Sequence, residues 1–163
     1  MTPGPAGTTV PAAPDAPALL RGSGLRVTDQ RVAVLEVLRG APHADADDVV
    51  RAVRERLGRV SVQAVYDVLA ALGRARLVRR IEPAGSPARF ELRVGDNHHH
   101  LVCRACGEVR DVDCAVGAAP CLVPGASGGP VDGFVVDEAE VIYWGTCAAC
   151  AATPALLATA PDA

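Results

Sequence analysis

The sequence predicts an α+β fold in which an N-terminal winged helix-turn-helix domain precedes a small C-terminal α/β domain. Two observations carry this prediction. Helical apolar repeats with good N-cap residues fill the first half and end in two short extended segments, as in a winged helix. After Gly95, segments rich in Val and Ile alternate with turns, and two Cys-x2-Cys pairs appear.

The charge of the chain is divided unevenly between these two halves. Residues 19–93 contain 14 Arg and nine acidic residues, a net charge of +5, whereas residues 94–163 contain two Arg and nine acidic residues, a net charge of −7. The full chain carries only −3. A basic half beside an acidic half indicates a polyanion-binding module next to a cation-binding one.

Both ends of the chain are rich in Ala, Pro and Thr and offer little to bury. We therefore expect a disordered tail over 1–17 and a flexible tail over 152–163, with a winged-helix domain at 18–93 and a metal-binding dimerisation domain at 94–151. The sequence shows no signal-peptide pattern and no apolar run of about 18 residues. These features favour a cytoplasmic protein with no membrane partner.

The first regular element of this domain should begin near Leu19. Thr28 is a good N-cap for a longer helix that carries apolar residues at helical spacing and ends at Gly40. A second helix is predicted from residue 45 or 46 to residue 57, where Gly58 stops it. A third begins at Ser61, and the extended segments VRRIEP and ARFEL then form a hairpin around a Pro- and Gly-containing turn.

A helix-turn-helix followed by such a wing is typical of domains that bind double-stranded DNA. The third helix would enter the major groove, where Gln63 could pair with an adenine edge and Tyr66 could contact phosphate or a thymine methyl. The alternative is that the arginines only form a solvated face. The predicted DNA-contacting residues are Arg21, Arg26, Arg31, Ser61, Gln63, Ala64, Tyr66, Asp67, Arg79, Arg80 and Arg89.

The second domain should contain a small antiparallel sheet. Residues 97–103 and 108–113 alternate as strands about a CRACG turn, and residues 133–144 form a third strand candidate. Residues 114–132 are rich in Ala, Gly and Pro and show no pattern. Because so small a sheet is not stable alone, we expect a homodimer.

Two kinds of metal chemistry meet in this domain. Cys103 and Cys106 form one Cys-x2-Cys pair and Cys147 and Cys150 form another, and two such turns supply the four thiolates of a structural Zn²⁺. Two redox dithiols are the alternative. The two remaining cysteines, Cys114 and Cys121, are either inert small apolar residues or a candidate redox pair that forms a reversible disulfide.

The histidine run offers the second chemistry. His98 and His100 project from the same face of a strand, whereas His99 points the other way. Imidazoles joined by carboxylates suit an exchangeable Zn, Fe or Mn ion. Plain surface histidines are the alternative. Further donors for a site between the two domains are His43, Glu91 and Asp111.

These residues and their order resemble the ferric uptake regulator (Fur) family of metal-dependent bacterial repressors. The similarity covers residues 19–150 and rests on RVTDQR, HADADDV, SVQAVYDVL, RFE and NHHHLVCRACG with the terminal Cys-x2-Cys. It implies a homodimer that binds an inverted repeat in DNA when its regulatory metal is present. It also implies structural zinc on the four paired cysteines. The regulatory ligands that it implies are His43, Glu91, His98, His100 and Asp111.

Within the family, DVDCAVGAAPCL and VVDEAEVIYWG resemble the actinobacterial FurA/CatR branch, whose members repress catalase-peroxidase genes and are relieved by peroxide. This resemblance favours Fe²⁺ or Mn²⁺ as the regulatory metal over Zn²⁺ or Ni²⁺. An iron, zinc or nickel uptake regulator is the first alternative. A zinc hydrolase is a more distant alternative, because no His-Glu-x-x-His signature is present and a basic winged helix would be unexplained. A structural zinc-ribbon adaptor is the third alternative, and it predicts that replacing His98 or His100 leaves DNA binding unaltered. We expect the protein not to be an enzyme and to have no small-molecule substrate.

Overall fold

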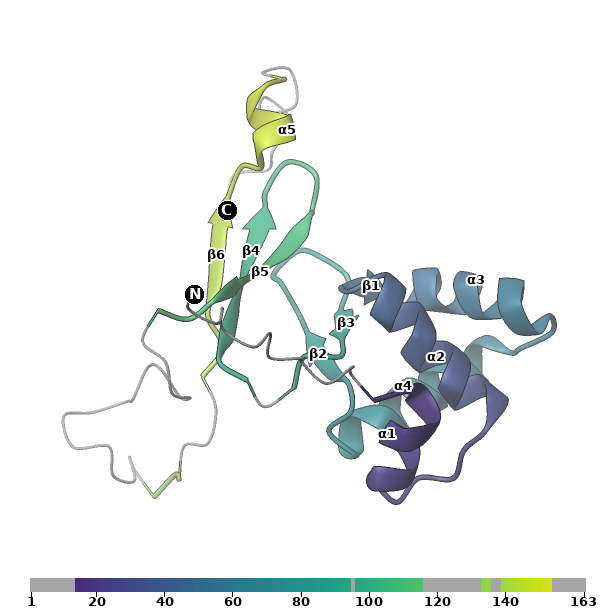
Figure 1. The fold of residues 1–163 in the computed structure, drawn as a ribbon. Coiled ribbons are helices and arrows are strands. Elements are labelled where there is room, and N and C mark those ends of the chain that lie inside the picture. The colour runs from purple at the N-terminus through teal and green to yellow at the C-terminus, as the bar shows by residue number, and fades with distance from the viewer. Residues whose placement is uncertain (1–13, 95, 116–132, 136–138, 154–163) are drawn as a thin grey trace, which may run out of the picture.

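The computed structural model describes residues 14–94, 96–115, 133–135 and 139–153 and shows the expected α+β fold. A helical unit, residues 14–94, lies beside a sheet unit that comprises the remaining described residues (Figure 1). No helix among the described residues is long and apolar enough to span a membrane. The helices of the helical unit are α1 (Ala16–Gly22), α2 (Asp29–Gly40), α3 (Ala46–Leu57) and α4 (Val62–Arg74).

The predicted helix boundaries are confirmed by the capping contacts. The Thr28 and Ser61 hydroxyls accept hydrogen bonds from backbone N–H groups three residues ahead, at 3.4 and 3.1 Å, and Asp45 caps α3 in the same way at 2.8 Å. Gly58 ends α3 with a φ of 77°, a conformation that favours glycine. Local capping chemistry therefore defines these helices before any packing is considered.

The first helix begins earlier than expected. Asp15 caps α1 by accepting from the N–H of Ala18 at 2.7 Å, so the helix starts at Ala16, inside the range that composition assigned to the tail. The reason is tertiary, because the Leu20 side chain and Ala16 are completely buried against the core. The Pro- and Ala-rich composition around Asp15 concealed this contact.

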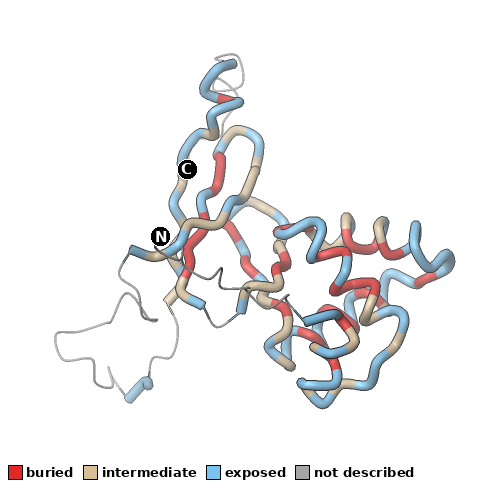
Figure 2. Tube along the Cα trace, in the orientation of Figure 1, coloured by how far each residue is buried: buried red, intermediate tan, exposed pale blue. Residues whose placement is uncertain are grey.

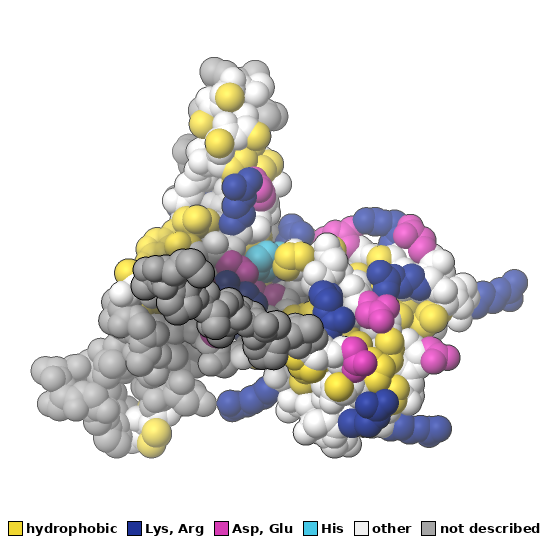
Figure 3. Space-filling view, viewed as in Figure 1, with side chains coloured by type: hydrophobic (Ala, Val, Ile, Leu, Met, Phe, Trp, Pro, Cys, Tyr) yellow, Lys and Arg dark blue, Asp and Glu magenta, His cyan; other side chains and the backbone are white. Residues whose placement is uncertain are grey.

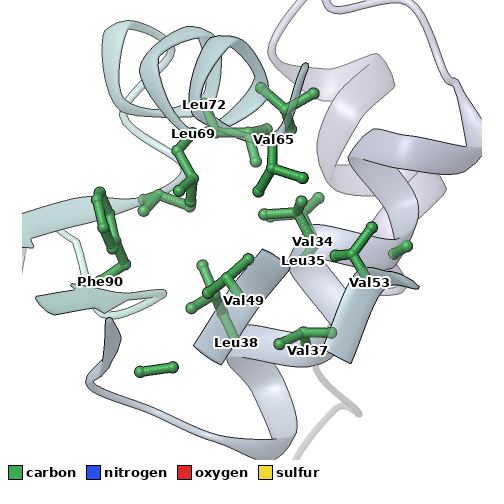
Figure 4. Packing of buried hydrophobic residues seen from close by; sticks show 14 of the residues in the cluster. Val34, Leu35, Val37, Leu38, Val49, Val53, Val65, Leu69, Leu72 and Phe90 are labelled. Atoms are coloured by element: carbon green, nitrogen blue, oxygen red, sulfur yellow. The ribbon is translucent and has the colours of Figure 1, made fainter. Parts of the chain in front are cut away.

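The helical unit surrounds one apolar core (Figure 4). Val34 and Leu35 of α2, Val53 of α3 and Leu72 of α4 are fully buried, and Phe90 closes the core from the wing. Side chains at helical spacing thus supply one continuous interior. Buried positions follow the inward faces of these helices, as Figure 2 shows.

The wing is a three-stranded sheet in the order β1 (Ala44–Asp45), β3 (Arg89–Glu91), β2 (Arg79–Ile81). The predicted hairpin of β2 and β3 is confirmed. The two-residue strand β1 was not foreseen, because so short a segment carries no periodicity. Its pairing with β3 places residue 43 beside the end of the wing.

The sheet unit has the strand order β5 (Val109–Asp113), β4 (His98–Cys103), β6 (Ile142–Gly145), followed by the single turn α5 (Ala148–Ala151). Strands β4 and β5 are antiparallel as expected, but β6 pairs with β4 in parallel. The expectation of a wholly antiparallel sheet was therefore wrong. The third strand is also shorter than predicted, since it begins at Ile142 rather than near residue 133.

Parallel pairing has a direct chemical consequence. Cys103 ends β4 and is in register with Gly145 at the end of β6, so the two Cys-x2-Cys turns leave the sheet at the same end. An antiparallel β6 would have carried its cysteine pair to the opposite end of β4. The direction of this strand is what brings the four cysteines together.

Candidate metal centres and nucleic-acid interface

Glu91 lies at the centre of a buried cluster between the two units. Its side chain is almost fully buried, with Oε2 3.1 Å from Nε2 of both His43 and His100 and Oε1 3.1 Å from Nε2 of His98. In the space-filling view, histidine surface is visible where the units meet, beside acidic and basic side chains (Figure 3). A carboxylate held by three imidazoles is a strong cue for a metal site.

Asp111 completes this cluster from β5, where it is in register with His100 on β4. Its Oδ1 lies 2.7 Å from Nε2 of His43, 3.7 Å from His100 and 4.0 Å from His98. Although this oxygen is buried, it accepts no hydrogen bond of good geometry among the described residues. A cation would satisfy it, together with the imidazole lone pairs that face the same point.

All five residues proposed from sequence as nitrogen and oxygen ligands are therefore brought together. The tightest group, whose ligand atoms all lie within 4.8 Å of one another, is His43, Glu91, His100 and Asp111. His98 joins through its contact with Glu91. His99 points away, as expected, and its ring lies 5.9 Å from that of Tyr143.

His43 has a strained backbone. Its φ of 65° lies in the left-handed region, where a residue with a side chain pays about 1–2 kcal/mol. The strain is held by a hydrogen bond of 3.0 Å from the His43 N–H to the Phe90 carbonyl and by the pairing of β1 with β3. The wing thereby fixes the backbone at His43, whose imidazole contacts Glu91.

The electrostatics of the cluster follow from these contacts. Burial alone would lower the pKa of His43, but its contacts with Glu91 and Asp111 outweigh burial and raise that pKa above 6.5. Burial likewise opposes ionisation of Glu91, yet the contacts with His100 and His43 lower the Glu91 pKa to about 2. Glu91 is thus a carboxylate at neutral pH.

The sequence did not predict that Asp96 supplies a second carboxylate in contact with His98. Asp96 Oδ1 lies 2.8 Å from Nδ1 of His98, opposite the nitrogen that faces Glu91. Such a contact selects the imidazole tautomer whose Nε2 lone pair is free for a metal. The available signal was an acid two residues before the histidine run, which is too common to be informative.

The four cysteines of the two pairs form the other cluster, with all sulfurs within 4.8 Å of one another. The Cys147 N–H donates to Cys103 Sγ at 3.3 Å, and Sγ of Cys106 lies 3.8 Å from that of Cys147. Gly107 closes the first turn with a φ of 72°. Four thiol groups at one point fit a tetrahedral Zn²⁺.

The thiol pKa values are split within this cluster. Backbone N–H groups, chiefly that of Cys147, lower the pKa of Cys103 to about 6, whereas the contacts of Cys150 with Cys106 and Cys147 raise its pKa to about 12. Several thiolates at one point repel one another. A bound cation removes that conflict.

The residues predicted to contact DNA lie mainly at the start of α4 and in the segment 21–31, which runs from α1 into α2. Gln63, Tyr66 and Asp67 are exposed on α4, but Gln63 Nε2 donates to Asp67 Oδ1 at 2.8 Å. Pairing of Gln63 with a base would compete with this contact. Ser61 caps α4, which gives it a structural role. Arg21, Arg26 and Arg80 are exposed, and Arg31 and Ala64 are partly exposed.

Arg79 and Arg89, also predicted to contact DNA, are partly buried beside the metal cluster. The Arg79 Nε lies 4.0 Å from Glu91 Oε1, and the Arg89 guanidinium donates to the His43 carbonyl at 3.4 Å. Their side chains are only 16% and 20% exposed. Residues two apart in a strand share one face, so Arg89 lies on the same face of the wing as Glu91, and Arg79, which is in register with Glu91, lies there too.

Of the candidate redox pair, the structure describes Cys114. Cys114 is partly buried just after β5, where its N–H donates to the Asn97 carbonyl at 3.0 Å. Cys121 lies outside the described residues, as does most of the segment 114–132.

A winged helix joined through a histidine and carboxylate cluster to a sheet with a four-cysteine cluster defines a metal-responsive, DNA-binding transcription regulator. The chain belongs to the ferric uptake regulator family, whose family model matches residues 22–116. This membership excludes the hydrolase alternative, because the family consists of regulators rather than enzymes.

Three known proteins illustrate what this chain is similar to. It is 59% identical over 137 residues to the transcriptional regulator FurA of Mycobacterium tuberculosis, covering 84% of this chain and 90% of that protein. It is 29% identical over 137 residues to the peroxide operon regulator of Bacillus subtilis, covering 80% and 88%. A solved structure of the ferric uptake regulator from Pseudomonas aeruginosa with manganese has 28% identity and a TM-score of 0.58, covering 82% and 98%.

Proposed function

We propose that this chain is a metal-dependent repressor that binds an inverted-repeat operator as a homodimer and releases it in response to peroxide. Its targets would be catalase-peroxidase or other oxidative-stress genes. One observation carries the proposal: five nitrogen and oxygen donors from both units converge between the winged helix and the sheet. A metal there would fix the position of the DNA-binding unit, and its loss would free that unit.

The two clusters would hold different ions. We assign a structural Zn²⁺ to the four cysteines, Cys103, Cys106, Cys147 and Cys150. We assign a regulatory Fe²⁺ or Mn²⁺ to His43, Glu91, His98, His100 and Asp111, because imidazole and carboxylate donors suit these harder ions. The match to a regulator solved with manganese supports the second assignment.

Peroxide sensing rests on the chemistry of the nitrogen and oxygen site. Bound Fe²⁺ would activate peroxide for cleavage of its O–O bond, so that one oxygen atom is added to a neighbouring imidazole, which is oxidised, and the other leaves as water; Mn²⁺ would support DNA binding without that reaction. His43 is 8% exposed, more than His98 at 4% or His100 at 1%, which makes it the first candidate for oxidation. The similarity to a peroxide operon regulator supports this assignment.

The DNA-binding face would be the exposed side of α4 and the basic residues around it. Gln63 and Tyr66 would reach base edges or the backbone, while Arg21, Arg26 and Arg80 would contact phosphates. Arg79 and Arg89 are excluded from this set because they face the metal cluster.

The face of the sheet opposite the metal cluster supports a dimer. Leu101 and Tyr143 are cross-strand neighbours and are 44% and 49% exposed, although both are large apolar residues. Packing two such faces against each other would bury these side chains and give the small sheet a partner.

The decisive experiment compares the Fe²⁺ and Mn²⁺ forms of the purified, zinc-containing protein. Binding to a candidate promoter is measured before and after dilute peroxide, and peptides spanning His43, His98 and Cys114 are then weighed by mass spectrometry. We expect the Fe²⁺ form alone to release DNA and to gain one oxygen on a histidine. A disulfide with either metal would indicate a thiol switch instead.

An iron uptake regulator is the second candidate. A relative in Mycolicibacterium fortuitum, named ferric uptake regulation protein 1, is 59% identical over 126 residues and covers 77% of this chain. The same experiment separates the two functions. An Fe²⁺ form that keeps its DNA affinity in peroxide, and loses it only when iron is withdrawn, would indicate uptake regulation.

A further inference from the structure

The guanidinium of Arg93 holds three carboxylates at the junction of the units. Its Nε donates to Asp96 Oδ2 at 2.7 Å, Nη1 donates to Asp111 Oδ2 at 3.3 Å, and Nη2 donates to Asp113 Oδ1 at 2.8 Å. These contacts, led by that with Asp113, raise the pKa of Arg93, so the group is always charged. The residue follows the wing strand β3 by two positions, in the connection that leads to β4.

Two of these carboxylates connect Arg93 with the proposed metal ligands, since Asp111 is itself a ligand and Asp96 contacts the ligand His98. Asp111 uses Oδ2 for Arg93 and leaves Oδ1 facing the histidines. Asp96 uses Oδ2 for Arg93 and Oδ1 for Nδ1 of His98. One side chain thus orients one ligand by contact and a second through a single intermediary.

Charge balance agrees with this arrangement. Four carboxylates surround the site, those of Glu91, Asp96, Asp111 and Asp113, and two guanidiniums contact them, those of Arg93 and Arg79. With neutral imidazoles the sum is −2, which one divalent cation would neutralise. The exposed carboxylate of Asp113 anchors Arg93 to β5.

We propose that Arg93 is a positioning residue of the regulatory metal site, which sets Asp111 and, through Asp96, His98 in place and ties the connection between the units to β5. The inference rests on the proposed function, since it assumes that this cluster binds a divalent metal. Arg93 touches no metal itself; it acts by fixing the ligands that do.

The test is Mn²⁺ titration of the full-length, zinc-containing protein and its variants by calorimetry. We expect Arg93→Met to weaken Mn²⁺ binding roughly 10–100-fold, the usual effect of removing an outer partner of a ligand. Arg93→Lys should recover part of the loss, because it keeps the charge but cannot contact three carboxylates. Arg56→Met, which removes an exposed pair with Glu36 between α3 and α2, is the matched control and should bind Mn²⁺ as the parent does.

A double-mutant cycle separates positioning from simple stabilisation. Because Arg93 acts partly through Asp96, Arg93→Met and Asp96→Asn should weaken Mn²⁺ binding less together than the sum of their single effects. The metal-free melting temperature and the zinc content should stay close to those of the parent. Parent-like Mn²⁺ affinity in Arg93→Met, or strictly additive losses with a lower metal-free melting temperature, would overturn the inference. Failure of the parent to bind Mn²⁺ would instead overturn the proposed metal site.

Discussion

The two ligand clusters differ in where their residues come from. All four cysteines belong to the sheet unit and leave it in two short turns at one end. The other cluster takes His43 and Glu91 from the helical unit and the remaining ligands from β4 and β5. A metal on the cysteines would stabilise one unit, whereas a metal on the histidines and carboxylates would join two.

The interiors of the units explain this division. The helical unit buries a continuous apolar core. In the described part of the sheet unit, the buried apolar residues are only Val102, Cys103 and Cys150. Small cores commonly depend on a metal or on a partner. The sheet unit is therefore where metal removal should act on folding.

Loss of a buried cysteine should have the largest effect. Cys150→Ser removes one of four zinc ligands, and structural zinc binding in small domains is worth about 10–16 kcal/mol. We expect zinc to be lost and the sheet unit to unfold, as measured by metal analysis and circular dichroism. Cys114→Ser, outside the cluster, should keep its zinc. A Cys150→Ser protein with native zinc content would contradict the assignment.

Replacing a histidine of the histidine and carboxylate cluster should leave the fold intact and abolish the response to Mn²⁺. His100→Ala should keep its zinc and its helical spectrum, yet lose the protection of about 2.7 kcal/mol that Mn²⁺ gives the parent at 100 times its dissociation constant. Melting with and without Mn²⁺ measures this, and operator binding should fall in parallel. If His100→Ala also loses zinc, the two clusters are not independent.

A smaller effect is expected at the rim of the same site. Asp111 is 24% exposed in its side chain, and Asp111→Asn keeps an oxygen donor while losing its charge. We expect Mn²⁺ affinity to fall on the order of 10-fold, with DNA binding restored by excess Mn²⁺. Glu36→Gln, an exposed carboxylate on α2, is the control and should change neither property.

The smallest effect should be the pH dependence of the metal-free protein. The depressed pKa of Glu91 gives stability that is complete above 4.5 and is lost as the pH falls toward about 2. The raised pKa of His43 gives stability that is complete below 6.5 and is lost as the pH rises through the raised value. Metal-free melting temperatures should therefore be highest between these limits. His43→Gln should remove the decline on the alkaline side; an unchanged alkaline decline would argue against the His43 contact.

Prediction from sequence succeeded where a signal is local. The caps at Thr28 and Ser61 and the stop at Gly58 lie within a few residues of the helices that they bound. Prediction failed where contacts between segments that are distant in the sequence determine the structure. Burial of Leu20 extended α1 into the expected tail, and β1 exists only because it pairs with β3.

The same division holds for the candidate sites. The sequence by itself determined the ligand types, the cysteine pairs and the alternation that points His98 and His100 to one side, because each depends on covalent spacing along one segment. Only the tertiary structure decided that β6 runs parallel to β4, that Arg79 and Arg89 lie on the Glu91 side of the wing, and that Arg93 contacts both Asp96 before β4 and two carboxylates of β5. Those outcomes depend on how separate segments meet, and no spacing within one segment encodes that meeting.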